Sequence, residues 1–128
     1  MVAALELRAH PEGGYYRETW RDSPADGSRG AGTAILFLLC AGERSHWHRV
    51  DAAELWIWQA GAPLLLEMPG QTLTLGPDLG AGQALQRVVP AGIWQAARSL
   101  GAWSLVTCTV SPAFIFAGFE LAPPDWAP

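Results

Sequence analysis

The sequence predicts an all-β fold, a sandwich or a barrel, and three observations support this class. Short runs rich in β-branched and aromatic side chains recur at near-regular spacing along the 128 residues. Gly- and Pro-containing turns separate the runs, and little of the chain has a helical pattern. Hydrophobic residues make up 50% of the chain and charged residues only 16%, which is typical of a compact globular protein. We therefore expect one domain, residues 1–128, with its own core.

The first half of the chain divides into an arm, strands and a loop. Residues 4–10 are expected to form a short helix or an extended arm, since a proline and two glycines break regular structure after them. Residues 15–21 alternate as a strand does, with Tyr16, Glu18 and Trp20 on one face. The next expected elements are a Gly-, Ser- and Asp-rich loop at 22–32, which we expect to be the most mobile segment, and strands at 33–41 and 43–49.

The second half consists of strands separated by turn residues. Asp51 can bond the backbone of a turn through its carboxylate, and Gly61 can end the strand after that turn, because it tolerates a positive φ. Thr107 and Thr109 alternate with Cys108 in a strong strand signal. The expected strands are 54–59, 63–68, 72–75, 86–89, 93–98, 103–110 and 114–121, followed by an extended, proline-rich tail at 122–128.

Composition excludes several classes of function. The chain has no lysine, which excludes Schiff-base chemistry and a P-loop, and no asparagine, which excludes N-glycosylation. A net charge of −4 argues against binding to nucleic acid. Cys40 and Cys108 are expected to be reduced, buried residues and not a disulfide framework. No signal-peptide pattern follows Met1, and the longest apolar run is too short to span a membrane, so we expect a soluble, cytoplasmic protein.

A pair of histidines marks the candidate site. His46 and His48 are two residues apart, and in a strand they would leave on one face, roughly 6 to 7 Å apart, with Trp47 pointing the other way. Two imidazoles on one face can bind one metal ion or one substrate. If the next strand returns as a hairpin, Glu54 comes back toward His48. The alternative is two surface histidines beside an ordinary hairpin.

Aromatic and basic residues near this pair have two interpretations each. Arg17 could bind a substrate carboxylate or phosphate, and Tyr16 could act as a general acid. The same segment could instead be an edge strand in a dimer interface, where Tyr, Trp and Arg are enriched. Trp56 and Trp58 share the face of Glu54, so they either fill the core or form an aromatic wall for a ring-shaped substrate.

The spacing of the site residues resembles the first motif of the cupin superfamily, and a second cupin motif is followed loosely. The first motif is carried by Gly42, His46, His48, Glu54 and Gly61, and the second by Gly82, Pro90 and Gly92. Longer segments are similar to the small-cupin family called cupin-5. These segments are HPEGGYYRETW at 10–20, SHWHRVDAAELW at 45–56, VVPAGIWQAARSLGAWSLVTCTVSPAF at 88–114 and FELAP at 119–123.

This resemblance implies a cupin jelly-roll barrel of the sugar-epimerase-like kind, usually dimeric. It also implies a divalent metal site, with Zn, Ni, Mn or Fe held by His46, His48 and Glu54. The fourth cupin ligand, normally histidine, falls on Gln95, whose amide oxygen is a weaker donor. The asparagine of the second motif falls on Ser99.

The resulting hypotheses concern a small polar molecule, sugar-like or a carboxylate. The first is an enzyme, either with the metal as Lewis acid or metal-free, with His48 as general base oriented by Glu54. Its pocket would be lined by Gln95 and the aromatic residues. The second is a non-catalytic small-ligand-binding cupin, and the third is a remnant whose pocket is closed by tryptophans. A homodimer through residues 15–20 is expected in each case.

Overall fold

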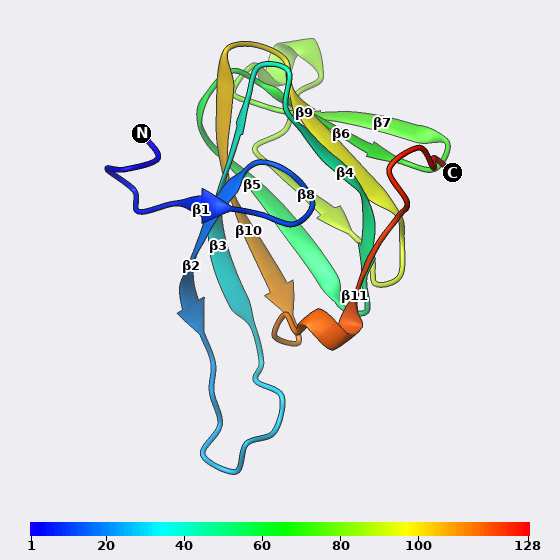
Figure 1. Cartoon of the computed structure of the whole chain (residues 1–128). Coiled ribbons are helices and arrows are strands. Elements are labelled where there is room, and N and C mark those ends of the chain that lie inside the picture. The colour runs from blue at the N-terminus through cyan, green and yellow to red at the C-terminus, as the bar shows by residue number, and fades with distance from the viewer.

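The computed structural model describes all 128 residues and consists mainly of antiparallel strands (Figure 1). The strands are β1 Arg8–Ala9, β2 Tyr15–Arg21, β3 Thr33–Cys40, β4 Arg44–Val50, β5 Ala53–Gly61, β6 Leu64–Met68, β7 Gln71–Leu75, β8 Gln86–Val89, β9 Gln95–Ser99, β10 Trp103–Ser111 and β11 Phe119–Leu121. Two short 3-10 helices are η1 Leu79–Ala81 and η2 Phe116–Gly118. Neither has the length and apolar character that a membrane crossing requires.

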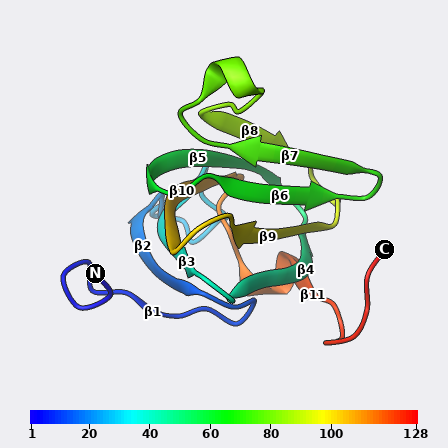
Figure 2. The ribbon, with the colours of Figure 1, turned by 90° about the horizontal axis from the view of Figure 1, so that it is seen from above.

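The strands form two sheets that face each other. One has the order β1-β2-β3-β10-β5-β8 and the other the order β11-β4-β9-β6-β7. Seen from above, the two sheets curve around a common interior (Figure 2). Chain-neighbouring strands such as β3 and β4 lie in different sheets, so the chain crosses from one sheet to the other, as in a jelly roll.

The connection between β4 and β5 differs from the predicted hairpin. β4 pairs with β9 and β11, whereas β5 pairs with β10 and β8. The turn at Asp51 therefore carries the chain from one sheet to the other. His48 and Glu54 still meet in the interior, but they approach it from opposite sheets.

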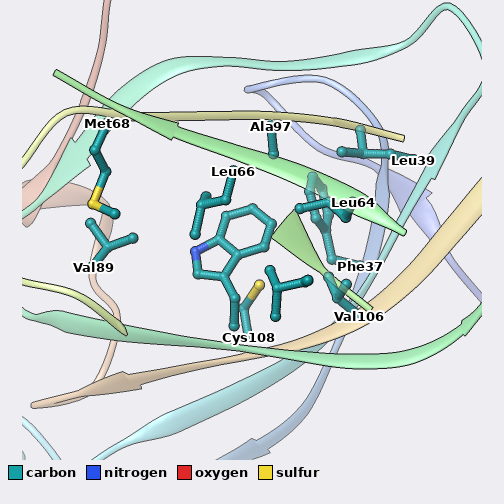
Figure 3. Packing of buried hydrophobic residues seen from close by; sticks show 11 residues of the cluster. Phe37, Leu39, Leu64, Leu66, Met68, Val89, Ala97, Val106 and Cys108 are labelled. Atoms are coloured by element: carbon teal, nitrogen blue, oxygen red, sulfur yellow. The ribbon is translucent and has the colours of Figure 1, made fainter. Parts of the chain in front are cut away.

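One part of the interior is filled by a hydrophobic core, in which side chains from both sheets pack together (Figure 3). Trp56 belongs to this core and is fully buried. Its ring lies edge-on to Phe37, with 5.9 Å between the ring centroids. The core cluster consists of Phe37, Leu39, Trp56, Leu64, Leu66, Met68, Leu75, Val89, Ala97, Val106 and Cys108. Alternate residues of each strand supply these side chains, because successive side chains of a strand point to opposite faces.

The other end of the interior is bounded by the start of β3, the start of β5 and the end of β10. Thr33 pairs with Val110, and Val110 pairs with Glu54, so three strands present side chains there in one row. Figure 1 shows the long β2–β3 loop extending beyond the barrel, with η2 near the same end.

The predicted strand 114–121 is only half correct. Residues 116–118 form η2, and only 119–121 pair as a strand, with β4. Phe114, Phe116 and Phe119 pack edge-to-face on one another around η2. Within residues 4–10, β1 pairs with Tyr15 and Tyr16 at the start of β2. Trp20, near the end of β2, lies outside this pairing and is exposed.

Candidate functional site

The open end of the barrel contains a cavity with a polar floor and an aromatic wall. The cavity offers about 60 Å³ to the centres of water molecules. Holding a single water takes roughly 10–15 Å³ of such space. The cavity therefore suits a small ligand. Its lining includes His10, Glu12, Tyr16, Glu18, Arg21, His48, Glu54, Cys108, Phe114, Phe116 and Phe119.

A buried ion pair between Glu12 and His48 forms part of the floor. Glu12 Oε2 lies 3.0 Å from His48 Nε2, and the other carboxylate oxygen accepts a 2.9 Å hydrogen bond from Ser45 Oγ. His48 Nδ1 lies 2.7 Å from the carbonyl oxygen of His46. Because both ring nitrogens face acceptors, both must donate, and His48 is an imidazolium.

The titration of this pair follows from its geometry. Burial alone would lower the pKa of His48, but the charge of Glu12 and the hydrogen bond to it outweigh burial and raise the pKa to about 9. Burial would raise the pKa of Glu12, but the charge of His48 and its hydrogen bond hold that pKa below the usual value. The two charges thus stabilise each other across the neutral range.

Glu54 is held on the opposite side of the floor by a second network. Gln95 Nε2 donates to Glu54 Oε1 at 2.9 Å, and Gln95 Oε1 accepts from Trp56 Nε1 at 2.8 Å. Burial raises the pKa of Glu54 to about 7, against the opposing charge of His48. Burial also raises the pKa of the neighbouring Cys108 thiol. Glu54 is therefore a carboxyl group that gains and loses its proton near neutral pH.

The mouth of the cavity combines three phenylalanines with a surface ion pair. Phe114, Phe116 and Phe119 form an aromatic wall, and Phe119 also lies against the ring of His48 at 5.6 Å between centroids. Arg21 donates to both oxygens of Glu18 at 2.8 Å each. A ligand entering the cavity would pass these groups before it reaches Glu54.

Comparison with known proteins identifies the family. Residues 1–122 match the family model Cupin_5, described as Cupin superfamily (DUF985). The chain belongs to this family. A protein from Shewanella oneidensis, solved by X-ray crystallography, is 43% identical, with a TM-score of 0.89 over 94% of this chain and 81% of that one. The cupin-5 resemblance and the jelly-roll class predicted from the sequence are therefore confirmed.

Other solved structures extend the likeness. A hypothetical protein from Leishmania major is 32% identical, with a TM-score of 0.85 over 94% of this cupin and 84% of its own chain. The DMSP lyase DddQ from Ruegeria pomeroyi is 18% identical, with a TM-score of 0.65 over 98% of this chain and 64% of that one, a likeness of fold alone. No curated protein matches the chain significantly.

The structure does not bring His46 to the cavity. Its Nε2 lies 2.8 Å from the carbonyl oxygen of Pro123, in the C-terminal tail. The reason is a β-bulge in β4, where Ser45 pairs with Ala97 but the next paired residue, His48, faces Gln95. This extra residue interrupts the alternation, so the prediction that the two histidines share one face is wrong.

Trp47 points away from the cavity, as predicted, and packs in a separate cluster with Ala96 and Ala122. The bulge therefore places both His46 and Trp47 outside the floor of the site.

The predicted metal-ligand set of His46, His48, Glu54 and Gln95 does not fit a metal in this cupin. His48 has no free lone pair, because both nitrogens face acceptors. The amide oxygen of Gln95 accepts from the indole N–H of Trp56 in the core, and Gln95 does not line the cavity. No group of three or more His, Cys, Asp or Glu side chains is arranged to hold a metal ion.

The other predicted residues separate into lining, supporting and outer positions. Tyr16 lines the cavity, and its ring lies 4.5 Å from the ring of His10. Arg17 is outside, in a 3.1 Å ion pair with Glu6. Gln95, Trp56 and Trp58 do not line the cavity, so their predicted roles in binding substrate are not supported by the geometry. Trp56 and Trp58 pack in the core and leave the cavity open.

His48 also differs from its predicted role as general base. A base needs an unprotonated nitrogen, and neither nitrogen of His48 offers one while Glu12 is ionised. Between His48 and Glu54, only Glu54 has a pKa near neutrality, at about 7.

Two residues of the floor, His10 and Glu12, were absent from the predicted site. Both stand in the segment HPEGG, immediately before β2, and a chain reversal there brings Glu12 against β4. The signal was available, because this segment carries part of the family resemblance and places a histidine and a carboxylate two residues apart beside two glycines.

Gly13 allows this reversal, and its replacement by alanine should be strongly destabilising. It has φ +108°, and an added Cβ would lie 2.0 Å from the backbone oxygen of Arg44. The control is Gly70→Ala, where φ is +71° but nothing lies within 4 Å. We expect Gly70→Ala to cost about 1 kcal/mol and Gly13→Ala at least twice as much, measured by chemical denaturation. Equal costs would contradict a close approach at Gly13.

Proposed function

We propose that this cupin catalyses a proton transfer on a small polar molecule, with Glu54 as the group that takes and returns the proton. The observation that carries the proposal is a buried carboxyl group with a pKa of about 7 in contact with a cavity. A general base works best when its pKa lies near the operating pH, because it is then available in both protonation states. This is a metal-free enzyme, as in one of the predicted hypotheses, but with Glu54 in place of His48 as the general base.

The remaining groups of the floor support this role. The Glu12–His48 ion pair is fixed by hydrogen bonds on both sides, so it can present a constant electrostatic environment while Glu54 changes its charge. Gln95 donates to Glu54 Oε1 and orients the carboxyl group. Small sugar-like molecules and small carboxylates are the candidate substrates, because the cavity combines polar groups on its floor with apolar phenylalanines at its mouth.

Glu54→Gln tests the proposal. Wild-type protein is incubated in D2O with dihydroxyacetone and, separately, pyruvate, and NMR follows the loss of C–H signal next to the carbonyl. We expect exchange in at least one case, with a rate that rises as the pH passes through about 7, the pKa of Glu54. Glu54→Gln should reduce the rate about 100- to 10,000-fold, the usual contribution of a general base.

The control variant is Glu67→Gln, which removes a carboxylate paired with Arg44 outside the cavity. It should exchange at the wild-type rate. Exchange by Glu54→Gln at the wild-type rate would refute the role of Glu54. Binding of either compound without any exchange by wild type would favour the second candidate, a non-catalytic small-ligand-binding cupin.

A further inference from the structure

The ring of His10 is held in one tautomer by the backbone. Its Nδ1 accepts a 3.1 Å hydrogen bond from the backbone N–H of Glu12, so Nδ1 carries no proton. The Glu12 carboxylate oxygen is 3.8 Å from the same nitrogen, too far for a hydrogen bond. Burial lowers the pKa of His10, against the charge of Glu12. The neutral imidazole therefore carries its proton on Nε2.

That Nε2–H has no partner within the protein. The side chain of His10 is only 7% exposed and lines the cavity. The only fully buried side-chain nitrogen or oxygen atoms without a hydrogen bond are Nε of Arg17 and Nε of Arg87. His10 Nε2 is not among them, so it retains access to space outside the protein. The ring itself is fixed by edge-on contacts with Tyr16 and Phe37. The result is an oriented donor without a protein acceptor.

The geometry assigns a catalytic role to His10, on the basis of the function proposed above: Nε2–H binds the carbonyl oxygen of a small ketone or aldehyde while Glu54 moves a proton at the adjacent carbon. A neutral N–H donor suits an oxygen that gains negative charge during the reaction. The cations of the cavity are both engaged, His48 by Glu12 and Arg21 by Glu18. A neutral carbonyl therefore suits this position better than a free carboxylate.

The proposed step balances without any further reagent. The Glu54 carboxylate takes the proton from the carbon next to the carbonyl, and the C–H electron pair forms a carbon–carbon double bond. The carbonyl electron pair moves to the oxygen, which becomes an enolate held by His10 Nε2–H. Protonated Glu54 then returns the proton to carbon. No bond to His10 is formed, and nothing is oxidised or reduced.

The first test observes His10 directly. Nitrogen-15 NMR of the wild-type protein should show a neutral ring protonated at Nε2. Titration with dihydroxyacetone should shift this N–H signal, and glycerol, which has the same carbon chain without the carbonyl, should not. A proton on Nδ1, equal shifts with both compounds, or no shift with dihydroxyacetone at 100 mM would each overturn the assignment.

The second test uses two variants that imitate opposite edges of the ring. His10→Asn can keep the acceptor for the Glu12 N–H but has no donor at the position of Nε2, whereas His10→Gln can keep that donor. We expect His10→Asn to slow proton exchange on dihydroxyacetone about 100- to 1000-fold. Its affinity for the compound should fall by no more than about tenfold. His10→Gln should recover most of the lost rate.

A purely structural role would give the reverse order, because His10→Gln loses the bond to the Glu12 backbone. The control is His46→Asn, which changes a histidine outside the cavity and should leave exchange unaltered. Exchange by His10→Asn at the wild-type rate, with Glu54→Gln inactive, would refute this inference and leave the proposed function standing. If wild type exchanges neither compound, the proposed function fails, and the NMR titration alone decides whether His10 binds a carbonyl.

Discussion

Replacing Glu12 by leucine should lower the free energy of unfolding by about 3 to 5 kcal/mol at pH 7, the usual cost of removing one partner of a buried ion pair. The side chain of Glu12 is 7% exposed and that of His48 is 2% exposed, so water cannot replace the lost carboxylate. His48 Nε2 and Ser45 Oγ would both lose their acceptor. Urea denaturation of wild type and variant measures the difference.

The same substitution should change how stability depends on pH. In the wild type the folded-state pKa of His48 is about 9, above its ordinary value of 6.5. The stabilisation is therefore complete below pH 6.5 and is lost as the pH rises through 9, by an amount on the order of 3 kcal/mol. Glu12 has a lowered pKa, so its contribution is lost in the opposite direction, as the pH falls below about 4.5.

The raised pKa of Glu54 affects the stability of the folded state in a different pH range. It makes the folded state less stable as the pH rises from 4.5 to about 7, because the carboxyl group is ionised in the unfolded chain there and must take up a proton on folding. In the Glu12→Leu variant, burial dominates the titration of His48 and lowers its pKa. The loss of stability between pH 6.5 and 9 should therefore be absent from this variant.

Glu120→Leu is the matched control for Glu12→Leu. Glu120 also pairs with a cation, Arg49 at 2.7 Å, but its side chain is 56% exposed. Exposed pairs of this kind contribute about 0 to 1 kcal/mol. Similar losses in the two variants, or a Glu12→Leu variant whose stability still falls between pH 6.5 and 9, would contradict a buried charge pair at the floor.

Trp56→Ala is expected to cost about 3 to 5 kcal/mol, the range for a large aromatic side chain removed from a core. Trp56 is fully buried among the core side chains, and its indole N–H is the donor to Gln95 Oε1. The variant thus creates a cavity and leaves a buried amide oxygen without its donor. The loss is a large fraction of the 5 to 15 kcal/mol that typically stabilises a domain. Denaturant unfolding followed by circular dichroism measures it.

Three further variants separate the contributions to the Trp56 result. Trp56→Phe keeps an aromatic ring but not the N–H, and should cost about 1 to 3 kcal/mol. Trp58 is partly buried, and Trp58→Ala should lie between Trp56→Ala and the control. The control is Trp20→Ala, at a side chain 53% exposed, with an expected change within about 0.5 kcal/mol. A Trp56→Ala variant as stable as the Trp20→Ala control would show that Trp56 does not organise the core.

The strands of this cupin could be predicted from the sequence because their signals are local. Residues 15–21 and 86–89 were predicted with the bounds that β2 and β8 have. The inward positions of Glu54 and Trp56 also follow from alternation within a single strand. The predicted homodimer through residues 15–20 stays a prediction.

The arrangement of the candidate site depends on contacts that local patterns do not contain. One extra residue in β4 turns His46 out of the barrel, and no composition rule distinguishes a bulged strand from a regular one. Glu12 meets Ser45 across 33 positions of sequence, and Gln95 meets Glu54 across 41.

The amino-acid sequence by itself determined the class of fold, most strand positions and three residues of the cavity, Tyr16, His48 and Glu54, because alternation and turn residues act over a few positions. The tertiary structure alone decided that Glu12 neutralises His48, that Glu54 titrates near pH 7 and that His10 keeps a free donor. Those properties arise from burial and from charges brought together by the two sheets, and both exist only once the barrel has closed.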